Sequence, residues 1–104
     1  MKVGAIEVAE ADLRAFCQKW RITEFAVFGS VLREDFSPES DVDVLVTFED
    51  GARWRYEDIW DMKLELAALF GREVDVAQRK LVETDENWLR RQRILESART
   101  LYAA

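Results

Sequence analysis

The sequence predicts a small α/β (α+β) protein in which helices pack on a mixed β-sheet, with the element order α-β-β-α-β-α. Two observations lead to this prediction. Apolar residues recur at helical spacing in three segments, and three short runs rich in Val and other apolar residues lie between them. Such alternation is typical of α/β architecture. With 104 residues, 49% of them hydrophobic, residues 1–104 are predicted to form a single domain with its own core.

The first half of the chain predicts one helix and two strands. Residues 8–20 are predicted to be helical because their apolar residues share one stripe. That stripe consists of Leu13, Phe16, Cys17 and Trp20. Residues 22–28 are rich in β-branched and aromatic types and stop at Gly29, which indicates a strand. Residues 30–40 predict a loop, and residues 42–48 a second strand.

The second half predicts a helix, a strand and a last helix. Residues 55–70 have an apolar face, and Gly71 stands where a glycine cap ends a helix. Residues 73–78 predict a short third strand. Thr84 is predicted to cap a last helix that runs through about residue 99. The inward residues of that helix are predicted to be Trp88, Leu95, Ala98 and Tyr102.

Composition excludes several kinds of chemistry and partner. The chain has no histidine, so no histidine base or histidine metal ligand is available. The single cysteine excludes an intramolecular disulfide and favours a cytoplasmic protein. The net charge of −6 argues against direct binding of nucleic acid, and no apolar run is long enough to span a membrane.

Two aspartates at the start of the second strand predict a metal site. Side chains at positions i and i+2 of a strand project to the same side, so Asp41 and Asp43 should share a face, opposite Val42 and Val44. Two carboxylates on one face repel each other unless a cation lies between them. Magnesium, which binds a few carboxylates together with substrate phosphates, is the expected cation.

A third carboxylate is expected at the same end of the sheet. The unit from strand 42–48 through helix 55–70 to strand 73–78 is a β-α-β crossover, so its two strands should be parallel. Asp75 would then lie near Asp41 and Asp43, and the three acids could hold two magnesium ions.

The Gly-Ser pair at the end of the first strand predicts a phosphate site. If strand 22–28 is antiparallel to strand 42–48, Gly29 arrives beside Asp41. Glycine permits close approach of a phosphate to the backbone, and the Ser30 hydroxyl can donate to phosphate oxygens. Arg33 follows closely and offers a forked pair of donors to the same phosphates.

Together these residues resemble the signature of the polymerase-beta-type nucleotidyltransferase superfamily. The resemblance consists of Gly29-Ser30, ten intervening residues, Asp41-Val42-Asp43 and an apolar continuation. Arg33 matches as well. The short chain is similar to the minimal nucleotidyltransferase (MNT) group, the antitoxin partners of HEPN-domain toxins.

The resemblance implies a fold, an activity and a set of roles. The fold would be the polymerase-beta-like nucleotidyltransferase fold. The activity would be transfer of AMP from ATP, with Mg²⁺, to a tyrosine hydroxyl of a HEPN ribonuclease toxin, which is thereby inactivated in a hetero-oligomer. Asp41, Asp43 and Asp75 would be catalytic and bind the metal, whereas Gly29, Ser30 and Arg33 would bind the nucleotide.

Two other functions remain open at this level. The chain could neutralise its partner by binding alone, without catalysis. It could also be a small metal-dependent nuclease that uses the same acids, although the Gly-Ser pair would then have no evident role.

Ordinary structural roles also remain open for individual residues. Gly29 could simply end a strand, and Asp75 could pair with Arg72 or Arg79. The tryptophans favour core or interface positions over a base-stacking set, with Trp54 the exception, in a loop near a nucleotide or partner. The basic residues of the last helix predict a solvated face, with partner docking as the alternative.

Overall fold

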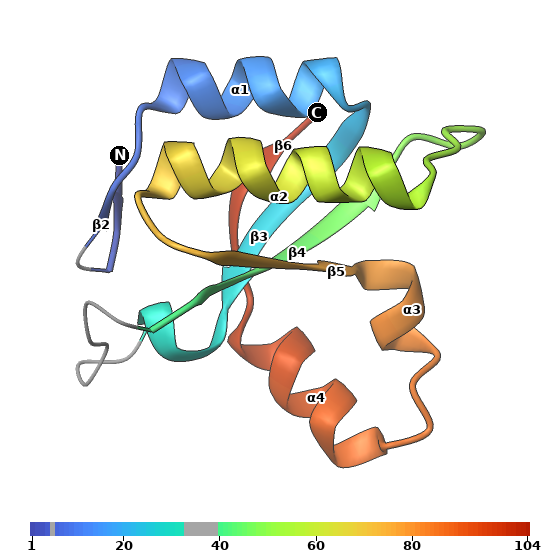
Figure 1. Cartoon of the computed structure of the whole chain (residues 1–104). Coiled ribbons are helices and arrows are strands. Elements are labelled where there is room, and N and C mark those ends of the chain that lie inside the picture. Colours follow the sequence, from blue (N-terminus) through green and yellow to red (C-terminus); the bar gives the residue numbers. More distant parts are fainter. Residues whose placement is uncertain (5, 33–39) are drawn as a thin grey trace.

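A computed structural model shows a four-stranded mixed sheet with helices on both sides (Figure 1). It describes residues 1–4, 6–32 and 40–104. The strand order is β5-β4-β3-β6. β3 (Ile22–Phe28) is antiparallel to β4 (Val42–Phe48) and to β6 (Arg99–Ala103), whereas β5 (Val74–Gln78) is parallel to β4. The predicted fold class is confirmed.

The helices form two unequal layers. α1 and α2 cover one side of the sheet, while α3 and α4 lie on the other (Figure 1). The remaining elements are β1 (Lys2–Val3), β2 (Ile6–Glu7), α1 (Glu10–Lys19), the 3₁₀ turn η1 (Gly29–Leu32), α2 (Tyr56–Phe70), α3 (Arg79–Glu83) and α4 (Trp88–Ser97). Within the described ranges, no helix is long and apolar enough to cross a membrane.

The core lies between the sheet and the pair α1 and α2. The predicted stripe of α1 is buried there, and α2 contributes Met62, Leu66 and Phe70. On β4, Val42 and Val44 are fully buried against these helices. Because side chains alternate along a strand, Asp43 between them points to the opposite side of the sheet. The burial of the valines therefore fixes the direction of the carboxylate.

The C-terminal quarter differs from the prediction of one helix. α4 begins after Asn87, whose side chain accepts a hydrogen bond from the Arg90 amide at 3.1 Å, so Thr84 is not the cap. The helix ends at Ala98, where the backbone becomes extended, and the chain continues as β6, which pairs with β3. Tyr102 therefore lies in a strand, and Trp88 is exposed rather than inward. Pairing with an open sheet edge outweighs the helical spacing of these residues.

The expectation that Trp54 lies near a nucleotide or partner is not supported. Its ring packs edge-on against Trp20, with 5.2 Å between centroids, and against Phe48 at 6.3 Å. Trp54 and Trp20 thus join the apolar core, as favoured for tryptophans in general. Trp60 and Trp88, in contrast, are exposed.

Cys17 provides a test of the core. Burial raises the pKa of the Cys17 thiol to about 12, whereas an unfolded cysteine ionises near about pH 8.5. The folded state therefore favours the neutral thiol. Its contribution to stability is complete below the unfolded pKa and is lost as the pH rises from about 8.5 toward 12.

We expect the free energy of unfolding of the wild type to fall more steeply above about pH 8.5 than that of Cys17→Ala. Urea unfolding at a series of pH values measures this difference. Equal pH slopes for the two proteins would contradict the buried thiol. In addition, a thiol reagent should label native Cys17 only as fast as the protein opens.

Candidate active site

Gly29 and Asp43 are in direct contact where β3 ends and β4 begins. Phe28 pairs with Asp43 across the antiparallel ladder, which brings the next residue, Gly29, against the carboxylate. A Cβ atom at Gly29 would lie 2.7 Å from Asp43 Oδ2, and the residue has a φ of +77°. Only glycine fits both this backbone conformation and this space. The antiparallel arrangement on which the sequence-based expectation depended is present, but the side chain beside Gly29 is that of Asp43 rather than Asp41.

Asp43 and Asp75 lie side by side on the open side of the sheet. They are direct partners in the parallel pairing of β4 and β5, so their side chains project in the same direction. The crossover through α2 makes these strands parallel, as the sequence predicted. The neighbouring Val42 and Val74 are buried on the other side. The fold thus brings together two carboxylates that are 32 positions apart in the sequence.

A cation from α2 lies close to Asp75. Lys63 Nζ lies 3.7 Å from Asp75 Oδ1, with both side chains partly exposed. Arg79, one of the two partners considered from the sequence, pairs instead with Glu24 at 2.9 Å. An exposed pair such as Lys63 and Asp75 contributes little to stability, so the lysine can yield to another cation at little cost.

The other predicted site residues are Asp41, Ser30 and Arg33. Asp41 is exposed and precedes β4, and Ser30 lies in η1 after Gly29. Arg33 lies outside the described residues. Within the described ranges, no group of three or more Cys, Asp or Glu side chains is close enough to hold a metal ion. The oxygen ligands of Asp43 and Asp75 suit Mg²⁺, but the three-carboxylate metal site remains a prediction.

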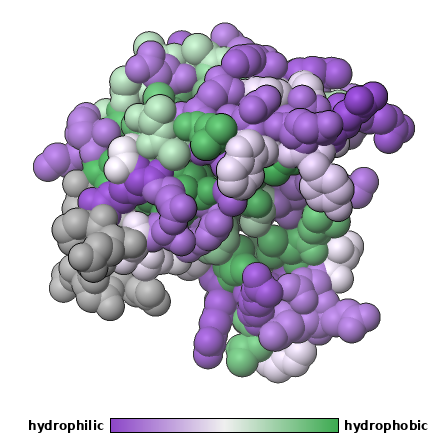
Figure 2. All heavy atoms as spheres, viewed as in Figure 1, coloured by the Kyte–Doolittle hydropathy of each residue, from purple (hydrophilic) through white to green (hydrophobic). Residues whose placement is uncertain are grey.

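A groove of about 1140 Å³ opens between this side of the sheet and α4. Its sheet wall includes Gly29, Asp43 and Asp75, and Arg90 and Arg93 of α4 line the opposite wall. In Figure 2, the part of the molecule that carries α4 projects below the body that carries the sheet, with apolar side chains where the two meet. Ser30 and Asp41 are not among the described residues that line the groove.

No site role was predicted for the arginines of α4. Their i, i+3 spacing was the available signal, because it places two cations on one face of a helix. The sequence did not show that β6 returns to the sheet and thereby holds α4 opposite the carboxylates.

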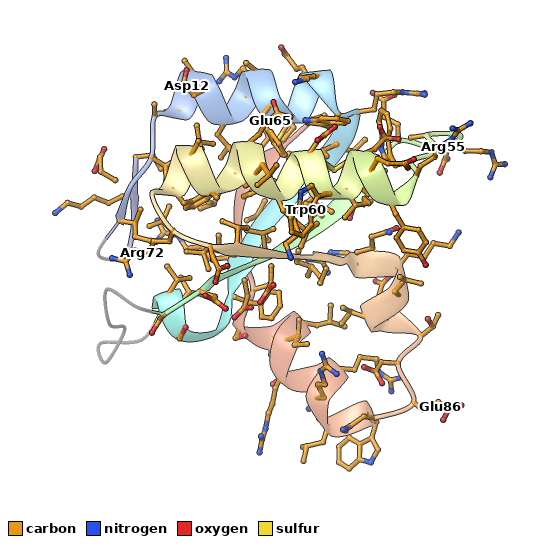
Figure 3. The ribbon with its side chains drawn as sticks, viewed as in Figure 1. Asp12, Arg55, Trp60, Glu65, Arg72 and Glu86 are labelled. Carbon is orange, nitrogen blue, oxygen red and sulfur yellow. The ribbon has the colours of Figure 1, made fainter. Side chains whose placement is uncertain are left out.

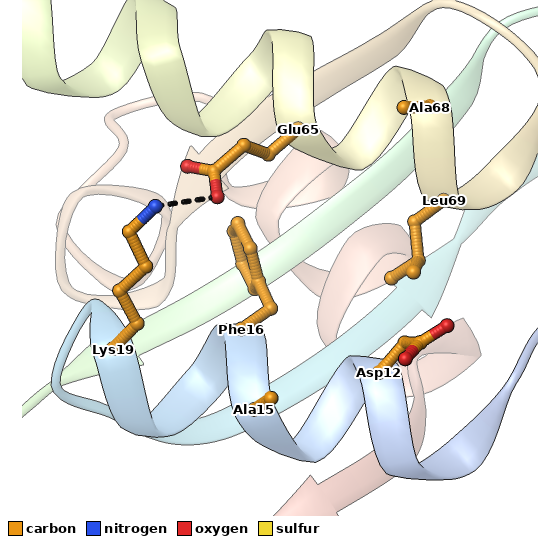
Figure 4. Close-up of a pocket in the computed structure, with 7 residues that line it drawn as sticks. All are labelled: Asp12, Ala15, Phe16, Lys19, Glu65, Ala68 and Leu69. Atoms are coloured by element: carbon orange, nitrogen blue, oxygen red, sulfur yellow. Dashed lines mark hydrogen bonds and ion pairs between the residues drawn. The ribbon is translucent and has the colours of Figure 1, made fainter.

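A second hollow, about 410 Å³ in volume, lies between α1 and α2, on the side of the sheet away from these carboxylates (Figure 4). Glu65 projects from α2 toward α1 across it (Figure 3). Glu65 accepts hydrogen bonds from Lys19 Nζ at 2.7 Å and from the Trp20 indole N–H at 2.8 Å. The hydrogen bonds of Glu65 therefore join α1 to α2 across this hollow.

Replacing Glu65 by Ala should lower the free energy of unfolding by about 1–3 kcal/mol, because a part-buried indole donor loses its acceptor. Glu65→Gln keeps an acceptor and should lose less. Glu57→Ala, an exposed change on the same helix, is the control. Urea unfolding would contradict this role if Glu65→Ala and Glu57→Ala were equally stable.

Comparisons with known proteins agree with this fold. The family described as "Nucleotidyltransferase domain" matches residues 13–101. None of the curated protein sequences matches the chain significantly. Among solved structures, one described as a minimal nucleotidyltransferase is 33% identical, with a TM-score of 0.64, and the match covers 86% of this chain and 85% of that one.

Two toxin–antitoxin structures share the fold at lower identity. One, described as a toxin–antitoxin with AMP-PNP, is 17% identical with a TM-score of 0.68, and the match covers 93% of this chain and 75% of that chain. The other is a complex of tri-AMPylated Shewanella oneidensis HEPN toxin with MNT antitoxin. It is 18% identical with a TM-score of 0.60, and the match covers 91% of this chain and 70% of that chain. The family match spans most of the sequence, and the chain belongs to the nucleotidyltransferase domain family.

Proposed function

We propose that this protein is a magnesium-dependent adenylyltransferase that acts as the antitoxin of a HEPN-domain toxin. The observation that supports it most strongly is the in-register pair of Asp43 and Asp75, with Gly29 packed against the first carboxylate. Membership of the nucleotidyltransferase family supports the reaction class. The proposed substrates are ATP and a tyrosine hydroxyl of the toxin.

In the proposed reaction, the acceptor oxygen attacks the α-phosphorus of ATP. The bond from that phosphorus to the bridging oxygen breaks, and pyrophosphate leaves with the electron pair. Asp75, which is exposed on the edge strand, is the proposed acceptor of the hydroxyl proton. Asp43, with Asp41 and Asp75, would hold Mg²⁺, which neutralises phosphate charge when bound.

The phosphates are assigned to the turn that follows β3. The absence of a side chain at Gly29 leaves the backbone open to close approach, and the Ser30 hydroxyl is a further donor. Arg33 has the same proposed role. The core and the N-terminal hairpin hold the 3₁₀ turn in place. Val31 is buried, and its carbonyl lies against Gly4 of that hairpin.

Support for the partner comes from related structures. One neighbour contains an AMPylated HEPN toxin bound to an MNT antitoxin, and another is a toxin–antitoxin structure with AMP-PNP. By analogy, we propose that this chain forms a hetero-complex with a HEPN toxin and modifies it. These complexes support the partner, whereas the proposed chemistry rests on the carboxylates of this chain.

Mass spectrometry tests the function directly. Purified protein, ATP, Mg²⁺ and the cognate toxin should yield toxin that is heavier by one or more AMP units, and chelation of the metal should prevent the shift. An unchanged toxin mass with folded wild-type protein would refute the enzyme. Protection of cells by an Asp41/Asp43 double-alanine variant would then favour neutralisation by binding alone.

A further inference from the structure

The face of α4 that lines the groove carries two guanidinium groups. Arg90 and Arg93 both line the groove and are one turn apart, so they project from the same side of the helix. Asn87 precedes them on that side and Ser97 follows. Asp43 and Asp75 stand on the facing wall. The α4 wall also includes Glu96, but its two arginines leave it with a net positive charge, so one wall attracts cations and the other attracts anions.

These arginines are more available than their neighbour on the same helix. Arg91 donates from Nη1 to the Asp85 carbonyl at 3.1 Å and does not line the groove. Arg90 has only a loose contact, 4.0 Å from Asp85 Oδ2, and 69% of its side chain is exposed. Among the described residues, the Arg93 side chain has no ion pair or hydrogen bond. Its guanidinium offers five N–H donors in a planar fork, which suits phosphate oxygens.

The sheet holds the C-terminal end of α4 close to η1, the turn that is proposed to bind the phosphates. β6 begins directly after the helix, and Arg99 pairs with Val27, two residues before Gly29. The last turns of α4 are thereby anchored beside the end of β3. Along the helix, Arg93 lies nearer to this anchor than Arg90 does.

We propose that Arg93, assisted by Arg90, binds the β- and γ-phosphates of the nucleotide and holds the pyrophosphate that leaves. This inference rests on the proposed function. The ligand that suits both walls is a metal-complexed polyphosphate, with its cation toward the carboxylates and its outer oxygens toward α4. The arginines donate hydrogen bonds to oxygens that gain negative charge as the bond to the α-phosphorus breaks.

Calorimetric titration with pyrophosphate and Mg²⁺ tests this role without an acceptor. Arg93→Ala should weaken pyrophosphate binding by about 10-fold to 100-fold, the usual size of a lost charge-assisted hydrogen bond, and should leave AMP binding unchanged. Arg90→Ala should have a smaller effect in the same direction. Arg14→Ala removes the same charge from exposed α1, outside the groove, and should bind pyrophosphate as the wild type does.

The outcomes separate this inference from the function on which it rests. Arg93→Ala that binds pyrophosphate normally, in a protein that transfers AMP, would overturn the inference and leave the function standing. Wild-type protein that does not bind pyrophosphate would also overturn it. Loss of toxin binding in place of pyrophosphate binding would reassign α4 to the partner. Arg93-dependent pyrophosphate binding without AMP transfer to any toxin would instead refute the proposed function.

Discussion

Replacing Asp43 by Asn should lower the rate of AMP transfer to the toxin by about 100-fold to 1000-fold. Asp43 lies beside Asp75 and against Gly29, and its proposed role is to bind the metal ion there. The amide of Asn has a similar shape but neither charge nor a second oxygen for the ion. Mass spectrometry of the toxin over time measures the loss.

The fold should survive this change. The substitution keeps the side-chain volume, leaves the buried valines of β4 in place, and removes a negative charge next to Asp75. Circular dichroism and urea unfolding should therefore match the wild type. Asp50→Asn, an exposed change in the turn after β4, is the matched control and should keep full transfer. Transfer at the wild-type rate by folded Asp43→Asn would exclude this carboxylate from the reaction.

Replacing Gly29 by Ala should impair both stability and transfer. The new methyl group would lie 2.7 Å from Asp43 Oδ2, and alanine resists the φ of +77° at this position. The free energy of unfolding should fall by about 1–3 kcal/mol, the usual range for a residue held in this backbone region. Transfer should fall at least about tenfold, because the carboxylate must move away from its position beside the turn that is proposed to bind the phosphates.

Gly51→Ala separates backbone strain from the clash. Gly51 has a φ of +86°, but an added Cβ would meet nothing within 4 Å. It should therefore lose stability through strain alone and keep its transfer activity. Urea unfolding and transfer assays on both variants make the comparison. Equal stability losses together with normal transfer by Gly29→Ala would show that the contact with Asp43 has no role in the site.

Much of the sheet could be predicted because its signals are local. The apolar runs of β3 and β4 end at clear boundaries, and both strands match the predicted limits of residues 22–28 and 42–48. The crossover rule correctly predicted that β5 is parallel to β4. This parallel pairing places Asp75 beside Asp43.

The prediction was wrong where tertiary pairing decides the structure. The residues of β6 follow α4 without a Gly or Pro, so the sequence carries no signal that the helix stops. The open edge of β3 accepts these residues as a strand, and this pairing sets the position of α4. The contact of Lys63 with Asp75 and the groove between two charged walls both depend on such long-range placement. They could not be inferred from the order of residues alone.

Because Asp43 and Asp75 are paired across β4 and β5, the site depends on the register of these two strands. A shift of one residue in β4 would turn Asp43 into the apolar core and bring a valine to the groove, because side chains alternate with a period of two. Substitutions in this strand change one side chain, whereas a single insertion would exchange the two faces. Insertions in the exposed turn at Asp50 and Gly51 leave the alternation intact. Changes in chain length should therefore be confined to such connections, and excluded from the strands that carry the carboxylates.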